Sequence, residues 1–159
     1  MVTRAKLVLA FSLWVLSFGS PAEASVRLVP DQRALAAILG LLDQATSSVE
    51  LIQFSFAIDD GKGTIDRRLD SYKVAQKLAE QKKRHGSRIR IQLYLEATRD
   101  TAERNKITAD FLSAHGVEVK LGATHAKAFI VDGQSVFFGS TNLTTQSLAR
   151  NNETNLLVE

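Results

Sequence analysis

The chain has 159 residues, of which 45% are hydrophobic and 23% charged, and its formal net charge is +3. This composition is that of an ordinary globular domain, which excludes intrinsic disorder, collagen and long coiled coils. The absence of cysteine excludes disulfide frameworks, thiolate zinc sites and cysteine nucleophiles.

The first 24 residues have the pattern of a secretory signal peptide. Basic residues precede an uncharged apolar run over residues 7–18, and Ala22 and Ala24 supply the small residues of a cleavage site. The run of 12 residues is shorter than the roughly 20 of a membrane-spanning helix. We therefore expect cleavage before Ser25 and a periplasmic or secreted domain over residues 25–159. A retained N-terminal membrane anchor is the alternative.

The remaining sequence alternates between the periods of strands and helices. Asp31 is a candidate N-cap, and Asp132-Gly133 between two apolar runs is a strong hairpin signal. Alternating elements predict an α/β domain with a mixed sheet flanked by helices. The expected elements are strand 26–29, a helix after Asp31, strand 49–56, a polar loop over 59–70, a helix ending at His85, strand 89–95, a helix from Asp100 or Thr101 to Gly116, strand 117–121, hairpin strands 126–131 and 136–138, and strand 155–158.

Only one of the three histidines lacks a structural explanation. His85 and His115 each precede a glycine at a predicted helix end, where a cation suits the helix dipole and glycine can form a left-handed cap. His125 instead precedes an apolar strand. Lys127 follows two residues later and shares its face of the strand.

The hairpin gathers further polar groups near His125. It returns Gly139 and Ser140 opposite the start of the strand that carries Lys127, and Asn142 lies just beyond. One nucleophile or base among three donors suits a phosphate oxyanion. A solvated strand end with incidental polar residues is the alternative that the spacing alone leaves open.

These residues resemble a known signature. His125, Lys127, Asp132 and the run Gly139-Ser140-Thr141-Asn142 fit the H-x-K-x4-D-x6-G-S-x-N motif of the phospholipase D superfamily. Glu153 is similar to the downstream glutamate of that superfamily. A single motif in a short exported chain most resembles the small bacterial endonuclease branch. The resemblance implies a phospholipase D-like domain over most of residues 25–159.

The resemblance also implies a mechanism that needs no metal or other cofactor. His125 would attack phosphorus and form a phosphohistidine intermediate. Lys127 and Asn142, assisted by Ser140, would hold the non-bridging oxygens. Glu153 would orient His125 by accepting a hydrogen bond from its far ring nitrogen.

Members of the superfamily use two such motifs, so one motif per chain implies a homodimer with a shared site. His125 of one subunit would then act as nucleophile, and His125 of the other as acid and base. Asp132 falls on the other face of its strand, and we assign it, with Gly139, a structural role in the hairpin. Small members usually add a C-terminal helix that this sequence lacks, and a fragment of a longer two-motif protein is the alternative.

The expected substrate is nucleic acid, and a phospholipid is the alternative, as for a phospholipase D or phosphatidyl transferase. An inactive nucleic-acid-binding relative is a third interpretation, against which the intact motif argues. We expect Phe54, Phe56 and Phe129 to lie in the core or beneath the site. A basic tract could bind a phosphate backbone or form solvated faces; it comprises Lys73, Lys77, Lys82, Lys83, Arg84, Arg88 and Arg90. Arginines in two loops could rim the site; these are Arg67, Arg68, Arg99 and Arg104.

Overall fold

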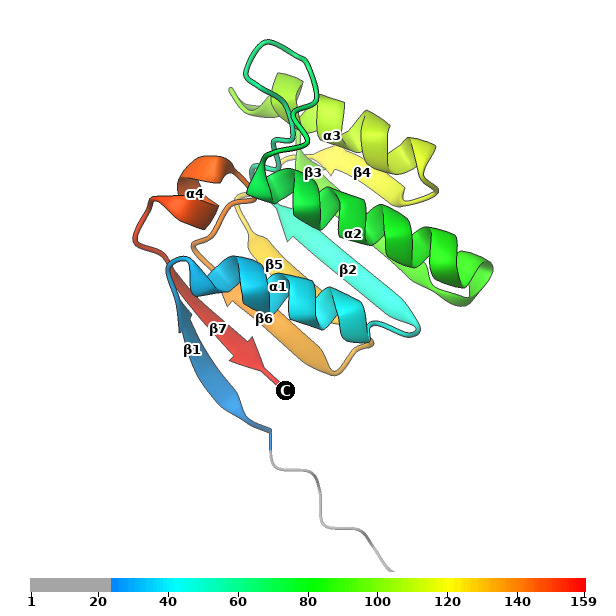
Figure 1. Ribbon diagram of the computed structural model, residues 1–159, viewed down its shortest axis with the longest axis vertical. Helices are drawn as coiled ribbons and strands as arrows, with labels where there is room; N and C mark the ends of the chain where they lie inside the picture. The colour runs from blue at the N-terminus through cyan, green and yellow to red at the C-terminus, as the bar shows by residue number, and fades with distance from the viewer. Residues whose placement is uncertain (1–23) are drawn as a thin grey trace, which may run out of the picture.

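The computed structural model describes residues 24–159, and the predicted signal peptide lies outside the described residues except for Ala24. A seven-stranded sheet with the order β1-β7-β6-β5-β2-β3-β4 forms its centre (Figure 1). The elements are β1 (Val26–Pro30), α1 (Arg33–Gln44), β2 (Ser48–Gln53), α2 (Asp70–His85), the 3-10 turn η1 (Gly86–Arg88), β3 (Arg90–Glu96), α3 (Ala102–Ala114), β4 (Glu118–Gly122), β5 (Lys127–Val131), β6 (Ser135–Gly139), α4 (Thr145–Ala149) and β7 (Thr154–Val158).

The sheet is mixed, which confirms the predicted fold class. Strands β2, β3 and β4 run parallel to one another. Strand β5 joins β2 antiparallel, and β6, β7 and β1 continue the antiparallel half. The two crossovers of the parallel half run through α2 and α3, and right-handed crossovers in one direction place both helices on the same face. The carboxyl ends of β2 and β3 therefore meet the amino end of β5 at one edge of the sheet.

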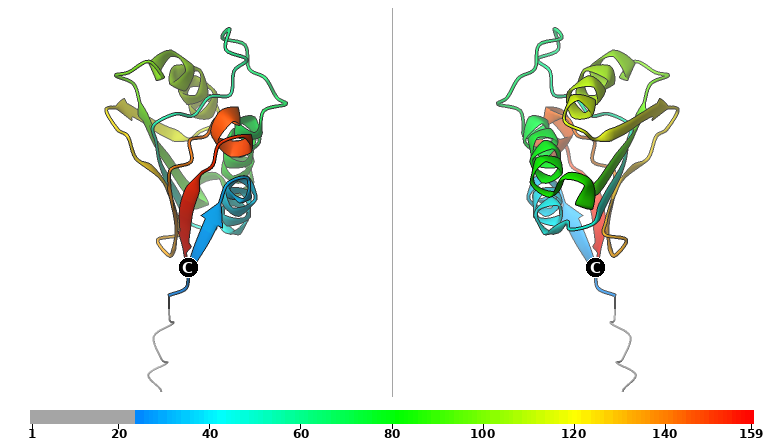
Figure 2. Two further views of the ribbon diagram at one scale, coloured as in Figure 1. Left: turned by 90° about the vertical axis from the view of Figure 1, so that its left-hand side faces the viewer. Right: turned by 90° about the vertical axis from the view of Figure 1, so that its right-hand side faces the viewer.

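The core lies between the sheet and the layer formed by α1 and α2 (Figure 2). Alternate residues of each strand face these helices, as Leu51 and Phe129 do from opposite positions on β2 and β5. On the helices, Ile38 and Leu78 are fully buried. The helical spacing of apolar residues predicted both of these buried positions.

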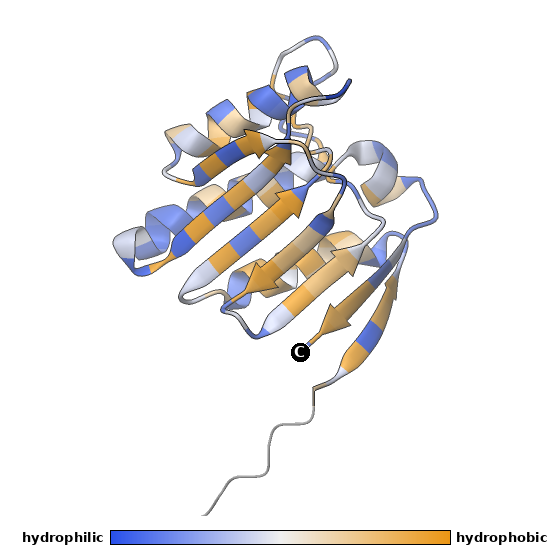
Figure 3. Cartoon of the chain, turned by 180° about the vertical axis from the view of Figure 1, so that it is seen from behind, coloured by the Kyte–Doolittle hydropathy of each residue, from blue (hydrophilic) through white to orange (hydrophobic). Residues whose placement is uncertain are grey.

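No helix of residues 24–159 covers the other face of the sheet, which is the face turned to the viewer in Figure 3. Leu28, Phe138 and Ile52 lie in one row across this face and are 59%, 41% and 38% exposed. No helix within the described part of the chain has the length and hydropathy to span a bilayer.

Three local expectations need correction. Asp31 does not cap α1: the N-cap is Gln32, and the Asp31 carboxylate accepts a hydrogen bond from the Glu153 backbone N–H at 3.0 Å instead. Strand β2 ends at Gln53, because the chain beyond it pairs only through an isolated bridge between Phe56 and Leu143. The short helix α4 lies in a stretch too polar to reveal it.

The expectations for two histidines are confirmed. His85 is the last residue of α2, and His115 is the C-cap of α3. The glycine after each has a positive φ, +60° at Gly86 and +82° at Gly116. These are left-handed conformations that favour glycine at helix ends.

Candidate active site

The row of residues that faces the helices changes from apolar to polar at the carboxyl end of β2. One row lower, Leu51, Phe129 and Phe137 lie side by side and are all buried. In the next row Gln53 lies opposite Lys127, and Gly139 lies opposite Asn155. Since burying polar groups is costly, this change of character marks the end of the core and the start of a site.

His125 and Lys127 both contact Phe54, the residue that follows β2. The His125 ring centroid lies 4.5 Å from that of Phe54, with the planes tilted by 46°. Lys127 Nζ lies 5.2 Å from the Phe54 ring centroid and donates a hydrogen bond of 2.9 Å to the His125 carbonyl oxygen. The structure therefore brings the predicted nucleophile and its lysine together. Phe54 packs beneath both, which is one of the two positions that the sequence analysis expected for it.

The ammonium group of Lys127 is half-buried. Burial lowers the pKa of Lys127 below its ordinary value, and the negative charge of Glu153 opposes this shift. Glu153 therefore lies close enough for its charge to act on the lysine. A cation held in a partly desolvated place interacts more strongly with an anionic ligand than one in water.

Glu153 is buried, but its hydrogen bonds differ from the expected one. One carboxylate oxygen accepts from Ser140 Oγ at 2.5 Å, and the other from Asn151 Nδ2 at 3.1 Å. Within residues 24–159 the His125 ring has no hydrogen bond to Glu153. The Ser140 hydroxyl also accepts from the Thr154 backbone N–H at 2.9 Å. In this arrangement Ser140 binds Glu153 and its proton is not free for a phosphate.

Gly139 allows two backbones to approach closely. A Cβ atom placed on it would lie 2.3 Å from the Thr154 carbonyl oxygen and 2.6 Å from Asn155 Oδ1. That oxygen accepts from the Thr141 backbone N–H at 3.2 Å. The glycine thus permits a junction that fixes the segment leading to Asn142.

Asn142 reaches the site because its segment crosses to the end of β2. The backbone N–H of Leu143 donates to the Ser55 carbonyl oxygen at 2.9 Å. The side-chain oxygen of Asn142 is buried without a hydrogen-bond partner among the described residues. The amide nitrogen is the donor group of the Asn142 side chain, and a residue that binds phosphate oxygens must supply such a donor.

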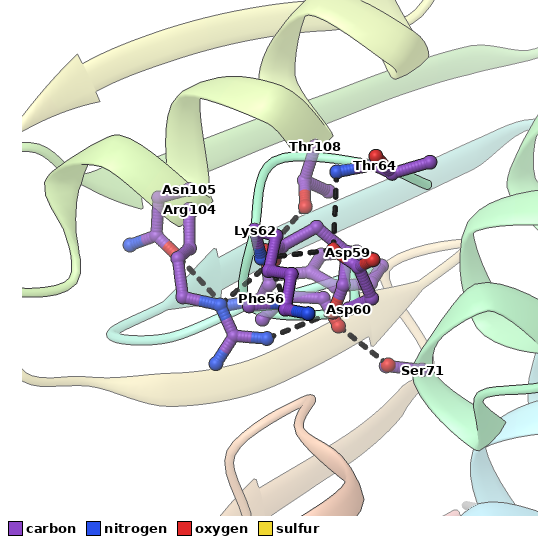
Figure 4. Close-up of polar contacts among 11 residues, drawn as sticks. Phe56, Asp59, Asp60, Lys62, Thr64, Ser71, Arg104, Asn105 and Thr108 are labelled. Carbon is purple, nitrogen blue, oxygen red and sulfur yellow. Dashed lines mark hydrogen bonds and ion pairs between the residues drawn. The ribbon is translucent and has the colours of Figure 1, made fainter. Parts of the chain in front are cut away.

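A buried asparagine of α3, which the sequence analysis did not single out, fixes the backbone around Phe54 (Figure 4). Asn105 Nδ2 donates to the carbonyl oxygens of Phe54 and Glu96 at 2.8 Å each. Asn105 Oδ1 accepts from the Phe56 backbone N–H at 2.8 Å. The available signal was a polar residue on the buried stripe of a helix, where Thr108 and Leu112 follow with helical spacing.

Glu96 holds the loop that leads into His125. Its carboxylate accepts from the Thr124 backbone N–H at 2.5 Å and from the backbone N–H of Thr98 at 2.6 Å. The Thr98 hydroxyl, then the Thr124 N–H, lower the pKa of Glu96 to about 2. The charged form of this carboxylate is therefore an anchor for the residue that precedes His125.

The basic residues fall into two groups. The tract extends along α2 into β3: Lys73 lies in the first turn of α2 and pairs with Asp70, whereas Lys82, Lys83 and Arg84 lie in its last turn, at the end of the sheet opposite the site. Arg104 lies near the site but pairs with buried Asp59, with Nε 2.7 Å from Oδ1 (Figure 4). Arg68 pairs with Asp66 at 2.7 Å. The expected rim of free arginines is thus partly neutralised.

Asp132 lies at the far end of β5 from Lys127. One of its carboxylate oxygens accepts from the backbone N–H groups of Ser47 and Ser48 and from the Ser47 hydroxyl. The other accepts from the backbone N–H and hydroxyl of Thr46. The residue joins the hairpin to the start of β2 and takes no part in the site.

Comparisons with known proteins identify the family and the fold. Residues 38–159 match the family described as cardiolipin synthase, PLD-like domain. The fold is similar to Nuc of Salmonella typhimurium, a phospholipase D family member, with a TM-score of 0.67, 21% identity and coverage of 86% of this chain and 83% of that one.

Two further structures show the same fold. NucT of Helicobacter pylori matches with a TM-score of 0.66 and 20% identity, over 86% of each chain. The phosphatidylserine synthase of Haemophilus influenzae matches with a TM-score of 0.62 and 11% identity, over 84% of this chain and 32% of that one. No curated protein matches the sequence. In the described part of the chain, no three histidine or carboxylate side chains are grouped to hold a metal ion.

Proposed function

The chain belongs to the phospholipase D-like family, and we propose that it is a phosphodiesterase whose nucleophile is His125. The observation that carries this proposal is the meeting of His125 and Lys127 over Phe54, with Asn142 and Glu153 at the same end of the sheet. An imidazole beside a partly desolvated ammonium can attack a phosphodiester while the ammonium stabilises the negative charge that develops on phosphorus.

The proposed reaction has two steps. In the first, a His125 ring nitrogen attacks phosphorus, the P–O bond to the leaving group breaks, and an acid protonates the leaving oxygen. In the second, the same acid, now a base, takes a proton from water, whose oxygen attacks phosphorus and releases His125. Lys127 and Asn142 hold the non-bridging oxygens in both steps.

The acid and base is His125 of a second subunit. His85 and His115 lie at the carboxyl ends of α2 and α3. Both histidines therefore lie near the amino ends of the strands that come after them, away from the site. A two-fold axis through the pocket would pair the two His125 side chains in one shared site.

Nucleic acid is the proposed substrate. The chain matches most of the length of Nuc and NucT, 83% and 86% respectively, and the single motif resembles the small endonuclease branch. A phospholipid is the second candidate, because the family description refers to cardiolipin synthase and a phosphatidylserine synthase shares the fold. The signal-peptide pattern supports a periplasmic or secreted location, with an N-terminal membrane anchor as the alternative.

One experiment compares the two substrates. Plasmid DNA and phosphatidylcholine vesicles are incubated side by side with the protein in EDTA, with His125→Ala as the control. Nicking of the plasmid by the wild type alone supports a nuclease. Release of choline alone would replace nucleic acid by phospholipid as the substrate, and turnover of neither would contradict the proposed phosphodiesterase.

A further inference from the structure

One side chain in the site has no role in the mechanism above and no partner. Gln53, the last residue of β2, is 1% exposed, and both Oε1 and Nε2 lack a hydrogen-bond partner among the described residues. The amide can accept two hydrogen bonds and donate two. A buried polar group left unsatisfied is expensive, and such groups often mark a functional role or a missing ligand.

The position of Gln53 relates it to the phosphate ligands. It lies directly opposite Lys127 in the β2–β5 ladder, where Cβ atoms are about 4.5–5.5 Å apart. Both side chains face the helix layer, since Leu51 and Phe129 in the next row are buried there.

Asn142 lies near the same strand end. The neighbouring Leu143 is bonded to the Ser55 carbonyl oxygen and forms a bridge with Phe56. The Oδ1 atom of Asn142 is a buried acceptor without a hydrogen-bond partner among the described residues. Gln53 thus lies opposite the lysine in the ladder and at the strand end that the Asn142 segment reaches, with an unused donor and acceptor.

We propose that Gln53 is a positioning residue of the phosphate site, bridging Lys127 and Asn142 when a substrate phosphate is bound. This inference rests on the proposed function. In the unliganded arrangement Lys127 Nζ donates to the His125 carbonyl oxygen. A bound phosphate draws the ammonium away from that carbonyl, and Gln53 Oε1 accepts a hydrogen bond from Lys127 Nζ. Gln53 Nε2 donates to Asn142 Oδ1, which turns the Asn142 amide nitrogen toward the phosphate.

A positioning role and a packing role predict opposite effects on stability and activity. Gln53→Met keeps the volume and removes the orphaned polar groups, so the melting temperature should stay unchanged or rise. The loss of alignment should lower kcat/KM for bis(p-nitrophenyl) phosphate by about 10- to 100-fold. The dissociation constant of inorganic phosphate should rise several-fold.

Gln81→Met is the matched control. Gln81 is a second buried glutamine, in α2, and its Nε2 donates to the Leu42 carbonyl oxygen at 2.6 Å. Its replacement should lower the melting temperature and leave kcat/KM and phosphate affinity unchanged.

The outcomes separate this inference from the proposed function. Equal phosphate affinity and kcat/KM in the wild type and Gln53→Met would overturn the role of Gln53 while leaving the phosphodiesterase intact. A wild type that binds phosphate but cleaves no diester would contradict the proposed function, and the phosphate affinities would still decide the role of Gln53. A wild type that neither binds phosphate nor cleaves a diester overturns both.

Discussion

Replacing Asp132 by asparagine should destabilise the fold without changing the chemistry of the site. The two carboxylate oxygens accept five hydrogen bonds from residues 46–48. An asparagine keeps one acceptor oxygen and places an NH₂ group against backbone N–H donors. The oxygen that is replaced accepts at least two of the five bonds, and their loss together with the weakening of the others should cost about 2–4 kcal/mol. For a chain of this length that is a fall in melting temperature of roughly 4–16 °C.

The pH dependence gives the same prediction a second measurement. Burial raises the pKa of Asp132, but the bonds from Ser48, Ser47 and Thr46 outweigh it, and the pKa lies well below its ordinary value. The stabilisation is therefore complete above the unfolded pKa of about 3.9 and is lost as pH falls below it. Urea unfolding of the wild type and Asp132→Asn should differ most near neutral pH and converge in acid.

A surface aspartate is the control. Asp110 on α3 pairs only with Lys106, at 2.8 Å, and both side chains are about two-thirds exposed. Asp110→Asn should change stability by less than about 1 kcal/mol. An Asp132→Asn variant as stable as the wild type, or one that folds normally but has lost turnover, would refute the structural role derived above.

The remaining predictions concern the reaction. Phosphodiester hydrolysis should survive EDTA, because His125 and Lys127 supply the nucleophile and the compensating charge; loss of activity that magnesium or zinc restores would contradict the mechanism. His125→Ala should abolish turnover, and the wild type should yield an acid-labile, base-stable phosphoryl adduct on His125, so wild-type rates in the variant would rule out this nucleophile. Mixed dimers of wild type and His125→Ala should not turn over, and the rate of the wild type should be bell-shaped in pH because its two imidazoles must begin in opposite protonation states. Sedimentation that finds an active monomer would refute the shared site.

The sequence could predict what depends on local spacing. The hairpin around Asp132-Gly133 is set by its turn residues and by alternation along β5 and β6, which bring Gly139 beside Lys127. The histidines at helix ends follow from their glycines. These features depend only on residues that are close together in the sequence.

Features that depend on distant contacts could not be predicted in this way. Asp31 has the residue type of an N-cap, but the Glu153 backbone N–H, far along the chain, engages its carboxylate. The hydrogen bonds of Glu153 to Ser140 and Asn151 likewise depend on how β6 and β7 meet. Asn105 acts on three backbone groups of two other segments, which no spacing rule connects.

The pairing of β1 with β7 determines when the pocket can be completed. Val26 lies opposite Val158, about 130 residues away along the chain, and β7 is the strand that joins β1 to the rest of the sheet. Contacts of such long separation form slowly, because the entropy of closing a long loop must be overcome before they contribute. Glu153 enters the pocket with that same segment. Until β7 has joined the sheet, the folding chain holds His125 and Lys127 without Glu153 in place beside them.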